Sequence, residues 1–137
     1  MRLWHEELIK HLPRQQLLGQ HRECCALRGK GWKKPHSTVN YIFNYSIMRL
    51  VAYHLVVMNE MKNRGYQVAE EWLDPSYCGK ILGYINVSNE NKVKVYELYK
   101  KGHIYKEHDD QYLEECLENL RGKNINIRGL TPDTLKR

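Results

Sequence analysis

Apolar residues recur at the three- and four-residue spacing of an amphipathic helix in three segments of this 137-residue chain. The segment 47–64 has the clearest pattern, with Ser46 as its N-cap, and the segment 13–28 begins with a proline and is followed by a glycine. The segment 109–121 opens with two aspartates, which favour a helix N-terminus. We therefore expect three main helices, preceded by a short helical segment over 4–11.

The remainder of the chain lacks such a period. Residues 66–91 contain Asp-Pro, glycine and asparagine signals and are expected to be mostly loop. Residues 92–101 fit a helix or a strand equally well, and the chain from Lys123 onward is polar and expected to be extended. The pattern predicts an all-α fold: a compact single-domain bundle of about three main helices with long loops, spanning residues 1–137.

Composition narrows the class of protein. The chain is 42% hydrophobic, too much for a disordered chain, yet its longest apolar runs have four residues, far short of the about 20 that a membrane span needs. Because no apolar stretch near the N-terminus resembles a secretory signal, we expect a cytoplasmic protein that binds no membrane and keeps its thiols reduced. The cysteines form no CxxC pair and are expected to be buried and inert: Cys24, Cys25, Cys78 and Cys116.

The histidines do not predict a metal site. Their densest group lacks a zinc-binding spacing, and its aspartates are explained equally well as a helix start. The group comprises His103, Glu107, His108, Asp109 and Asp110. We therefore expect no metal and no cofactor.

Charge is distributed unevenly along the chain. Lys and Arg number 22 against 16 Asp and Glu, a net charge of +6. Residues 1–64 contain 11 basic and 4 acidic side chains, whereas residues 65–137 contain 11 and 12. A positive excess confined to one half of the chain favours a polyanionic partner, with nucleic acid the first candidate. An ordinary basic protein without such a partner is the alternative.

A helix over 13–28 would have two distinct faces. Its polar face has Gly19 near the middle, and because glycine in a helix costs about 1 kcal/mol relative to alanine, Gly19 indicates that another molecule approaches there closely. A solvated face that tolerates one glycine is the alternative. The arc expected to face the core comprises Leu17, Leu18, His21, Cys24, Cys25 and Arg28. The arc expected to form a polar groove comprises Gln15, Gln16, Gly19, Arg22, Glu23 and Ala26.

This part of the chain resembles the pyrimidine-dimer DNA glycosylase family, that of endonuclease V. The resemblance rests on the N-terminal Met-Arg-Leu and on Gln-Gln-Leu-Leu-Gly-Gln-His-Arg-Glu over 15–23. Bacterial members are similar over most of the chain, including 34–39, 71–75 and 107–120. Phage members are similar over 1–25 and over the long helix ending at Arg64-Gly65-Tyr66.

The resemblance implies an all-α fold that acts on duplex DNA containing damaged pyrimidines. The implied reaction begins when the α-amino group of Met1 attacks the sugar C1′ and the base leaves. A protonated Schiff base then promotes β-elimination of the 3′ phosphate, with Glu23 as the essential carboxylate. The resemblance assigns DNA contacts to Arg2, Gln15, Gln16 and Arg22.

These groups also suit the chemistry on their own terms. An α-amine has a pKa of about 7.7–8.0, so part of it is neutral and nucleophilic at pH 7, unlike a lysine near 10.4. A neighbouring carboxylate can move protons during imine formation. Enzymes that act on a duplex must distort it and therefore need phosphate clamps and stacking side chains. One loop contains basic side chains that could clamp phosphates and an aromatic side chain that could stack: Lys30, Trp32, Lys33 and Lys34. The alternative is a solvated loop with Trp32 in the core.

The chain departs from the phage members in three ways. Arg2 is bulky enough to block removal of Met1, so a retained Met1 would supply the amine. Gln16 stands where phage members have histidine, and Cys-Cys-Ala over 24–26 stands where they have a further basic residue. Their aromatic C-terminal segment has no counterpart in 124–137. The resemblance therefore indicates the chemistry more firmly than the lesion.

His54 and Arg121 have two interpretations each, and His21 has one. His54 aligns with a polar family position near the site but is also explained as a core histidine, and His21 as a packing residue. Arg121 could contact a phosphate or complement a helix C-terminus. The overall expectation is a monomeric DNA repair glycosylase with abasic-site lyase activity. A non-catalytic nucleic-acid-binding module and a glycosylase for a different modified base are the alternatives.

Overall fold

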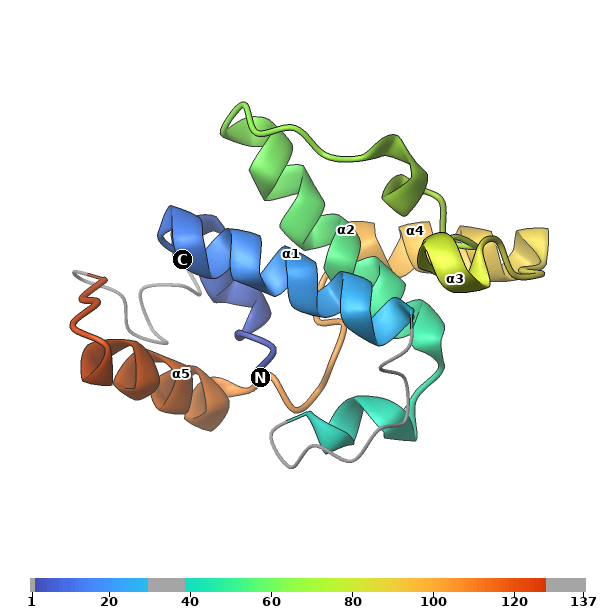
Figure 1. Ribbon diagram of the computed structural model, residues 1–137. Helices are drawn as coiled ribbons and strands as arrows, with labels where there is room; N and C mark the ends of the chain where they lie inside the picture. The colour runs from blue at the N-terminus through green and yellow to red at the C-terminus, as the bar shows by residue number, and fades with distance from the viewer. Residues whose placement is uncertain (1, 30–38, 128–137) are drawn as a thin grey trace.

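The computed structural model describes residues 2–29 and 39–127, and all regular secondary structure in these residues is helical (Figure 1). One isolated antiparallel bridge, between Tyr77 and Tyr84, is the exception to an otherwise strand-free described chain. The predicted mostly α fold is thus confirmed. No helix in this described part is both long and apolar enough to cross a membrane.

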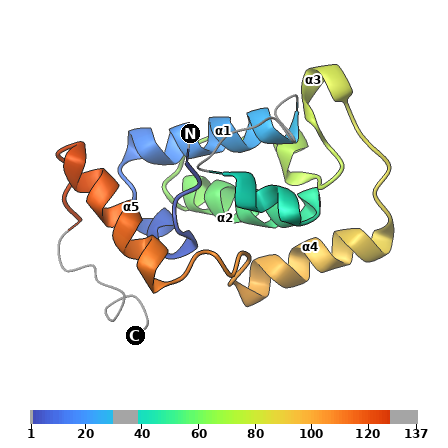
Figure 2. The ribbon, with the colours of Figure 1, turned by 90° about the horizontal axis from the view of Figure 1, so that it is seen from below.

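The central element is α2 (Ile47–Asn63), which begins as predicted after the N-cap Ser46, whose hydroxyl accepts the Met48 N–H at 3.1 Å. Figure 2 shows α2 between α1 (Arg14–Arg28) on one side and α4 (Asn89–Lys101) on the other. The sequence pattern predicts one buried stripe, but α2 is buried on nearly every side. It is surrounded by other helices, so residues off the stripe are buried too: Ala52, Tyr53 and Val57.

The ends of α1 and α5 follow the local signals in the sequence. Helix α1 starts after Pro13 and ends at Gly29, whose N–H donates to the Cys25 carbonyl at 2.9 Å. Helix α5 (Asp110–Gly122) has Asp109 as its N-cap, accepting the Tyr112 N–H at 2.8 Å. The short helical segment expected near the N-terminus is a 3₁₀ helix, η1 (Glu6–His11).

A fourth long helix, α4, corrects the expectation of about three. Helix α4 covers residues 92–101, for which the sequence pattern did not distinguish a helix from a strand. It begins after an N-cap serine, a local signal that hydrophobic periodicity does not include. Ser88 is its N-cap and accepts the Asn91 N–H at 3.1 Å, while Gly102 ends it at a φ of 76°. Only Val95 on this helix is fully buried. The weak apolar stripe explains why spacing alone did not decide between helix and strand.

The segment between α2 and α4 is mostly irregular, as predicted. It contains the short elements η3 (Glu70–Leu73) and α3 (Gly79–Leu82). A further 3₁₀ helix, η2 (Asn40–Asn44), precedes α2. Helix α5 lies apart from α2 and beside the N-terminal segment, and its buried stripe packs Leu113, Cys116, Leu117 and Leu120 into the core (Figure 1).

Candidate active site

The side chain of Gln20 fastens the N-terminal segment to α1. Its Oε1 accepts the Trp4 N–H at 2.6 Å and the Tyr53 hydroxyl at 2.9 Å, while its Nε2 donates to the Arg2 carbonyl at 3.1 Å. Gln20 is only 1% exposed, so these bonds are sheltered from water. The sequence assigned no role to this residue, because its partners lie 16 to 33 positions away.

Two tyrosines from other helices complete this attachment. Tyr112 of α5 donates its hydroxyl proton to the Leu3 carbonyl. The single hydroxyl proton of Tyr53 of α2 is shared between the Trp4 carbonyl and Gln20 Oε1. The Arg2 guanidinium carbon lies 5.6 Å from the centre of the Tyr112 ring. Terminal residues of proteins commonly fray unless they are tied down. Residues 2–4 are instead held by three helices at once, although the segment has no regular structure of its own.

Glu23 lies at the edge of this attachment. Its Oε2 is 3.5 Å from Gln20 Nε2, the same nitrogen that donates to the Arg2 carbonyl. Glu23 is half-buried. The structure thus brings together Arg2 and Glu23, two of the residues predicted for the site. Met1, predicted to supply the nucleophile, lies outside the described residues.

The predicted polar groove coincides with the outward face of α1. Gln15 and Arg22 are exposed, and Gln16 and Gly19 are half-exposed. A Cβ atom added at Gly19 would lie 3.7 Å from Arg22 Nη2, which is an ordinary contact. Nothing within the described chain therefore requires glycine at this position. The arc predicted to face the core does so only in part, since Leu17, Cys24 and Arg28 are buried whereas Leu18, His21 and Cys25 are half-buried.

Other predicted DNA contacts fall outside this face or outside the described residues. Lys30, Trp32, Lys33 and Lys34 belong to the undescribed segment 30–38. Arg121 is exposed on the last turns of α5 and pairs with Glu118 of the same helix at 2.7 Å. This ion pair is an i, i+3 pair on an exposed helix surface.

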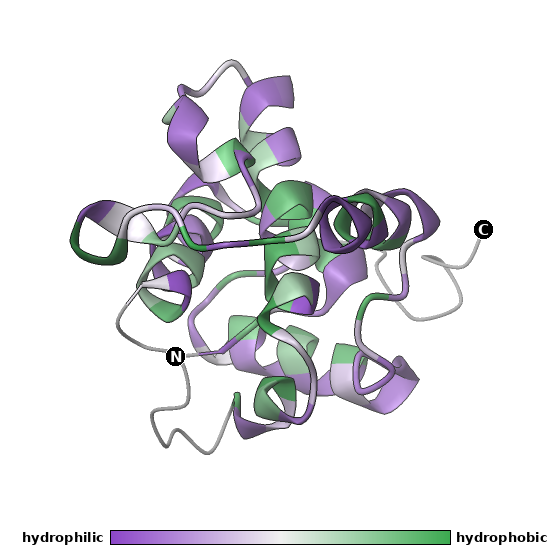
Figure 3. Cartoon of the chain, turned by 90° about the vertical axis from the view of Figure 1, so that its right-hand side faces the viewer, coloured by the Kyte–Doolittle hydropathy of each residue, from purple (hydrophilic) through white to green (hydrophobic). Residues whose placement is uncertain are grey.

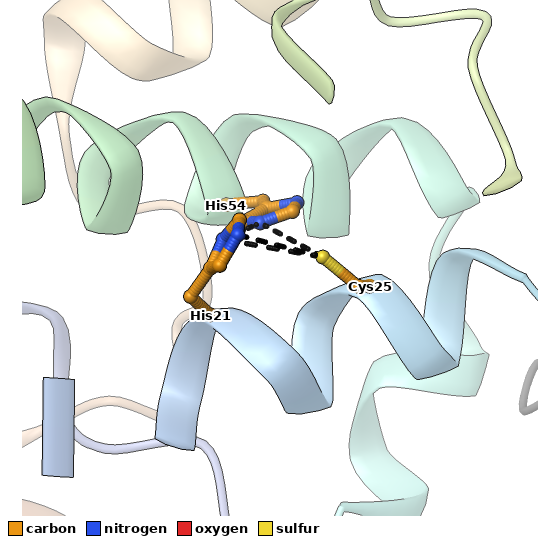
Figure 4. A group of neighbouring side chains, drawn as sticks. All are labelled: His21, Cys25 and His54. Carbon is orange, nitrogen blue, oxygen red and sulfur yellow. Dashed lines mark hydrogen bonds between the residues drawn. The ribbon is translucent and has the colours of Figure 1, made fainter. Parts of the chain in front are cut away.

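A second polar cluster lies between α1 and α2 (Figure 4). His21 Nδ1 is 2.8 Å from His54 Nε2, and Cys25 Sγ is 3.8 Å from His21 Nε2 and 3.9 Å from His54 Nε2. Two histidines and a cysteine at such distances are a ligand set that zinc could use. The sequence pattern did not identify this group. His21 and Cys25 lie four residues apart on one helix face, but His54 joins them only through helix packing, which no local pattern shows.

Arg28 determines which ring nitrogen of His54 carries the proton. Its Nη1 lies 3.0 Å from His54 Nδ1, and because a guanidinium only donates, His54 Nδ1 must accept. The remaining proton of the neutral His54 ring is then on Nε2 and is donated to His21 Nδ1. A metal bound at His54 Nε2 would need the lone pair of that nitrogen. The ring proton would then be on Nδ1, where it would face the guanidinium of Arg28. The geometry therefore favours a hydrogen-bonded core pair over a metal ligand set.

The protonation states agree with this arrangement. Burial, together with the charge of Arg28, holds the pKa of His54 well below its ordinary value, and burial also lowers the pKa of His21. Burial raises the pKa of the Cys25 thiol to about 11. His54 is fully buried and does not reach the outward face of α1, which agrees with its interpretation as a core histidine. The neutral thiol of Cys25 is a poor nucleophile.

Arg28 also joins α1 to the segment that follows η3. Besides its bond to His54, it donates to the carbonyls of Trp72, Asp74 and Tyr77, each at 2.8 Å. The guanidinium carbon lies 5.1 Å from the centre of the Trp72 ring. A side chain that is 1% exposed thus holds the C-terminal end of α1 against residues 72–77.

Three members of the acidic and histidine-rich group at 103–110 make hydrogen bonds within the fold: Glu107, His108 and Asp109. His108 Nδ1 accepts the Glu6 N–H at 3.2 Å, and its Nε2 lies 2.6 Å from the Tyr41 hydroxyl, so both ring nitrogens are engaged. Burial lowers the pKa of His108 to about 3. Asp109 caps α5, and Glu107 accepts the Tyr45 hydroxyl at 2.9 Å. The interpretation of these aspartates as a helix start is confirmed at Asp109.

The cysteines are free, as expected, and most of them are buried. Cys24, Cys78 and Cys116 are buried, whereas Cys25 is half-buried beside the histidine pair. Burial raises the pKa of all four thiols. The expectation of buried thiols is therefore correct for three of the four.

Comparison with known proteins assigns the chain to a family. A family model described as pyrimidine dimer DNA glycosylase matches residues 1–74, more than half of the chain. This range includes the N-terminal segment, all of α1 and all of α2. No curated protein and no solved structure matched the chain. On the family match, the chain belongs to the pyrimidine dimer DNA glycosylases.

Proposed function

We propose that this protein is a DNA repair glycosylase with abasic-site lyase activity, acting on damaged pyrimidine nucleotides in double-stranded DNA. The nucleophile is the α-amino group of Met1 and the essential carboxylate is that of Glu23. The observation that carries the proposal is the fixed N-terminal segment, held by Gln20 beside Glu23. Positioning of this kind is what a terminal amine needs to act as a nucleophile, because a freely moving amine would have to be ordered at every turnover.

The reaction proceeds in two stages. The neutral amine attacks C1′ of the damaged nucleotide, the bond from C1′ to the base breaks, and the base leaves with a proton. The attached nitrogen loses one proton, and the sugar ring opens as its O4′ takes up a proton, which gives a protonated imine between C1′ and the Met1 nitrogen. Removal of a proton from C2′ then breaks the C3′–O bond and expels the 3′ phosphate. Water finally hydrolyses the imine and frees the amine.

Glu23 suits the proton transfers in this scheme. A half-buried carboxylate next to the N-terminal segment can stabilise the developing positive charge at C1′ and move protons to and from the sugar. Gln20 acts through these groups, since its amide orients both the Arg2 peptide and Glu23. We call Gln20 a positioning residue for this reason.

The outward face of α1 supplies the DNA contacts in this proposal. Arg22 contacts a phosphate, Gln15 and Gln16 provide amide donors and acceptors, and Arg2 is proposed to contact the lesion strand. Gly19 lets the nucleic acid approach the helix backbone. The basic loop residues Lys30, Trp32, Lys33 and Lys34 are proposed to add phosphate and stacking contacts. We propose that the chain acts as a single-domain monomer without metal or cofactor.

Borohydride trapping on a duplex with one abasic site tests the proposal. The wild-type chain should form a covalent complex, because borohydride reduces the imine to a stable amine. Glu23→Gln should lose the complex, whereas Glu114→Gln, which changes an exposed carboxylate on α5, should keep it. Absence of a trapped wild-type complex would leave a non-catalytic DNA-binding module. Nicking of ultraviolet-irradiated and otherwise damaged duplexes then separates a pyrimidine-dimer enzyme from a glycosylase for another base.

A further inference from the structure

An apolar tip stands out from the surface just beyond the C-terminal end of α1. It is formed by α3 and the residues that follow, and four large apolar side chains are exposed on it: Ile81 by 70%, Leu82 by 53%, Tyr84 by 60% and Ile85 by 38%. Such a cluster at one turn differs from scattered surface hydrophobic residues and marks an interaction site. In Figure 3 it projects from the left edge of the molecule, and α4 lies on the opposite side.

The tip is built rigidly. The Cys78 N–H donates to the Gly83 carbonyl at 2.8 Å, the Gly83 N–H to the Gly79 carbonyl at 2.7 Å, and the Ile85 N–H to the Ser76 carbonyl at 2.8 Å. Gly79 and Gly83 have φ values of 93° and 63°, which other residues rarely adopt, so glycine is required for this turn. The exposed side chains are thus presented outward by a fixed backbone.

The tip is also attached directly to α1. Arg28, the last residue of α1, donates to the carbonyls of Trp72, Asp74 and Tyr77, which precede the turn. A Cβ atom added at Gly29 would lie 3.4 Å from the Cys78 carbonyl oxygen, so the end of the helix abuts the base of the tip. In Figure 2 α1 and α3 lie along the same side of the molecule, opposite α4. The tip therefore continues the face of α1 that is proposed to contact DNA.

The charge around the tip fits a polyanion. Lys80 is the one charged side chain in residues 75–89. The flanking carboxylates are both paired: Asp74 accepts the Ser76 hydroxyl and lies 3.9 Å from Lys92 Nζ, and Glu90 lies 3.9 Å from Lys94 Nζ. An apolar surface with a single lysine and no acidic group can approach a phosphate backbone without repulsion. Proteins that bend DNA commonly insert aliphatic side chains into the minor groove and between base steps.

We propose that the apolar tip enters a groove of the duplex bound along α1 and distorts it there by apolar contact. This inference rests on the proposed function, since it assumes that α1 faces DNA. It assigns the tip a role distinct from that of Arg22, because the tip contributes apolar contact and the arginine contributes phosphate contact. The tip also lies away from Glu23, so its loss should weaken DNA binding without removing the chemistry.

The test compares two variants of the full chain. The first replaces both Ile81 and Leu82 by serine. The second, Val93→Ser, removes an equally exposed apolar side chain from α4 on the opposite side of the molecule, where Val93 is 54% exposed. The probe is a duplex with a tetrahydrofuran abasic-site analogue, which binds but cannot form an imine. Binding is measured by fluorescence anisotropy at several salt concentrations.

The double variant should bind about tenfold more weakly at every salt concentration, because apolar contact is lost. The slope of log K against log salt should not change, since no phosphate contact is removed. Val93→Ser should bind like the wild type, and an Ile81→Leu, Leu82→Ile variant should retain binding because it keeps the tip apolar. At saturating abasic duplex the double variant should still be trapped by borohydride.

Two results would overturn the role of the tip. Unchanged affinity of the double serine variant would show that DNA does not contact it. A wild-type dimer in analytical ultracentrifugation that the double variant abolishes, with DNA affinity unchanged, would assign the tip to a second copy of the chain. The proposed function fails separately, when the wild type binds the duplex but yields no trapped complex. A wild type that binds no duplex overturns both proposals.

Discussion

Gln20 and Arg2 are joined by a hydrogen bond of 3.1 Å from the glutamine amide to the arginine backbone carbonyl. The same nitrogen lies 3.5 Å from Glu23 Oε2, and the other end of the amide holds the Trp4 N–H. One buried side chain therefore sets the distance between the N-terminal segment and the carboxylate of the candidate site. In an enzyme that uses its N-terminal amine, this amide would decide how well the nucleophile is placed.

Replacing Gln20 by leucine should lower both stability and the rate of imine formation. The Trp4 N–H and the Arg2 carbonyl would lose a buried partner, whereas the Tyr53 hydroxyl would keep the Trp4 carbonyl, so the free energy of unfolding should fall by about 2–3 kcal/mol. Chemical denaturation measures this loss, and single-turnover borohydride trapping at saturating abasic DNA measures the rate. Gln15→Leu, on the exposed side of α1, should leave the stability unchanged.

A conservative variant separates positioning from folding. Gln20→Glu keeps the acceptor for the Trp4 N–H but loses the donor to the Arg2 carbonyl, so it should trap slowly while binding DNA like the wild type. If the rate of Gln20→Glu equals that of the wild type, Gln20 has only a structural role.

Gly19→Ala should make the protein more stable and less active. Alanine fits at this position, where a Cβ atom would lie 3.7 Å from Arg22 Nη2, and its better helix propensity should raise the free energy of unfolding by about 0.5–1 kcal/mol. The same methyl group would stand between the helix and an approaching DNA backbone. Thermal unfolding and DNA affinity measure the two effects. A variant that is more stable and binds DNA as tightly would show that no molecule approaches Gly19.

The sequence could predict the helices because their end signals are local. Pro13, Ser46 and Asp109 mark helix starts within one turn of the bonds that they make. Helix α4 has such a signal at Ser88, but its stripe contains only one fully buried residue, so periodicity alone was ambiguous.

The sequence could identify residues of the candidate site only where they lie on a single helix. The outward face of α1 follows from spacing, so Gln15, Gly19 and Arg22 could be assigned to it. The role of Gln20 could not, because it depends on contacts with the N-terminal segment and with α2. The His21–His54 pair similarly depends on how two helices pack, which no local pattern determines.

Acid should unfold the protein through its buried histidines. Burial lowers the pKa of His108 to about 3, and burial together with Arg28 holds that of His54 well below its ordinary value of about 6.5. The unfolded chain binds these protons near pH 6.5 and the folded chain does not, so stability is complete above about pH 6.5 and falls below it. Each histidine should contribute a slope of about 1.4 kcal/mol per pH unit.

Urea unfolding between pH 7 and pH 5 measures this slope. His108→Asn should reduce the slope of the unfolding free energy against pH by the contribution of one histidine, even if the substitution also changes the stability at pH 7. A stability that does not change between pH 7 and pH 5 would contradict the assignment of neutral, buried histidines.

Zinc should not occupy the cluster of His21, Cys25 and His54 in the wild-type protein. Arg28 donates to His54 Nδ1 and leaves the proton on the nitrogen that a metal would need. Dialysis against micromolar zinc followed by metal analysis should find no bound ion, and the melting temperature should not rise. Stoichiometric zinc lost on His54→Gln would show instead that Arg28 turns away and that the cluster is a metal site.

Identification of the atom that carries the covalent link to DNA tests the central claim most directly. The wild-type protein is trapped with borohydride on an abasic duplex, digested with protease and nuclease, and analysed by mass spectrometry. We predict that the sugar remnant is attached to the α-nitrogen of Met1, and that Glu23→Gln gives no such peptide. Attachment to a lysine side chain, or a trapped complex that survives unchanged in Glu23→Gln, would contradict the account.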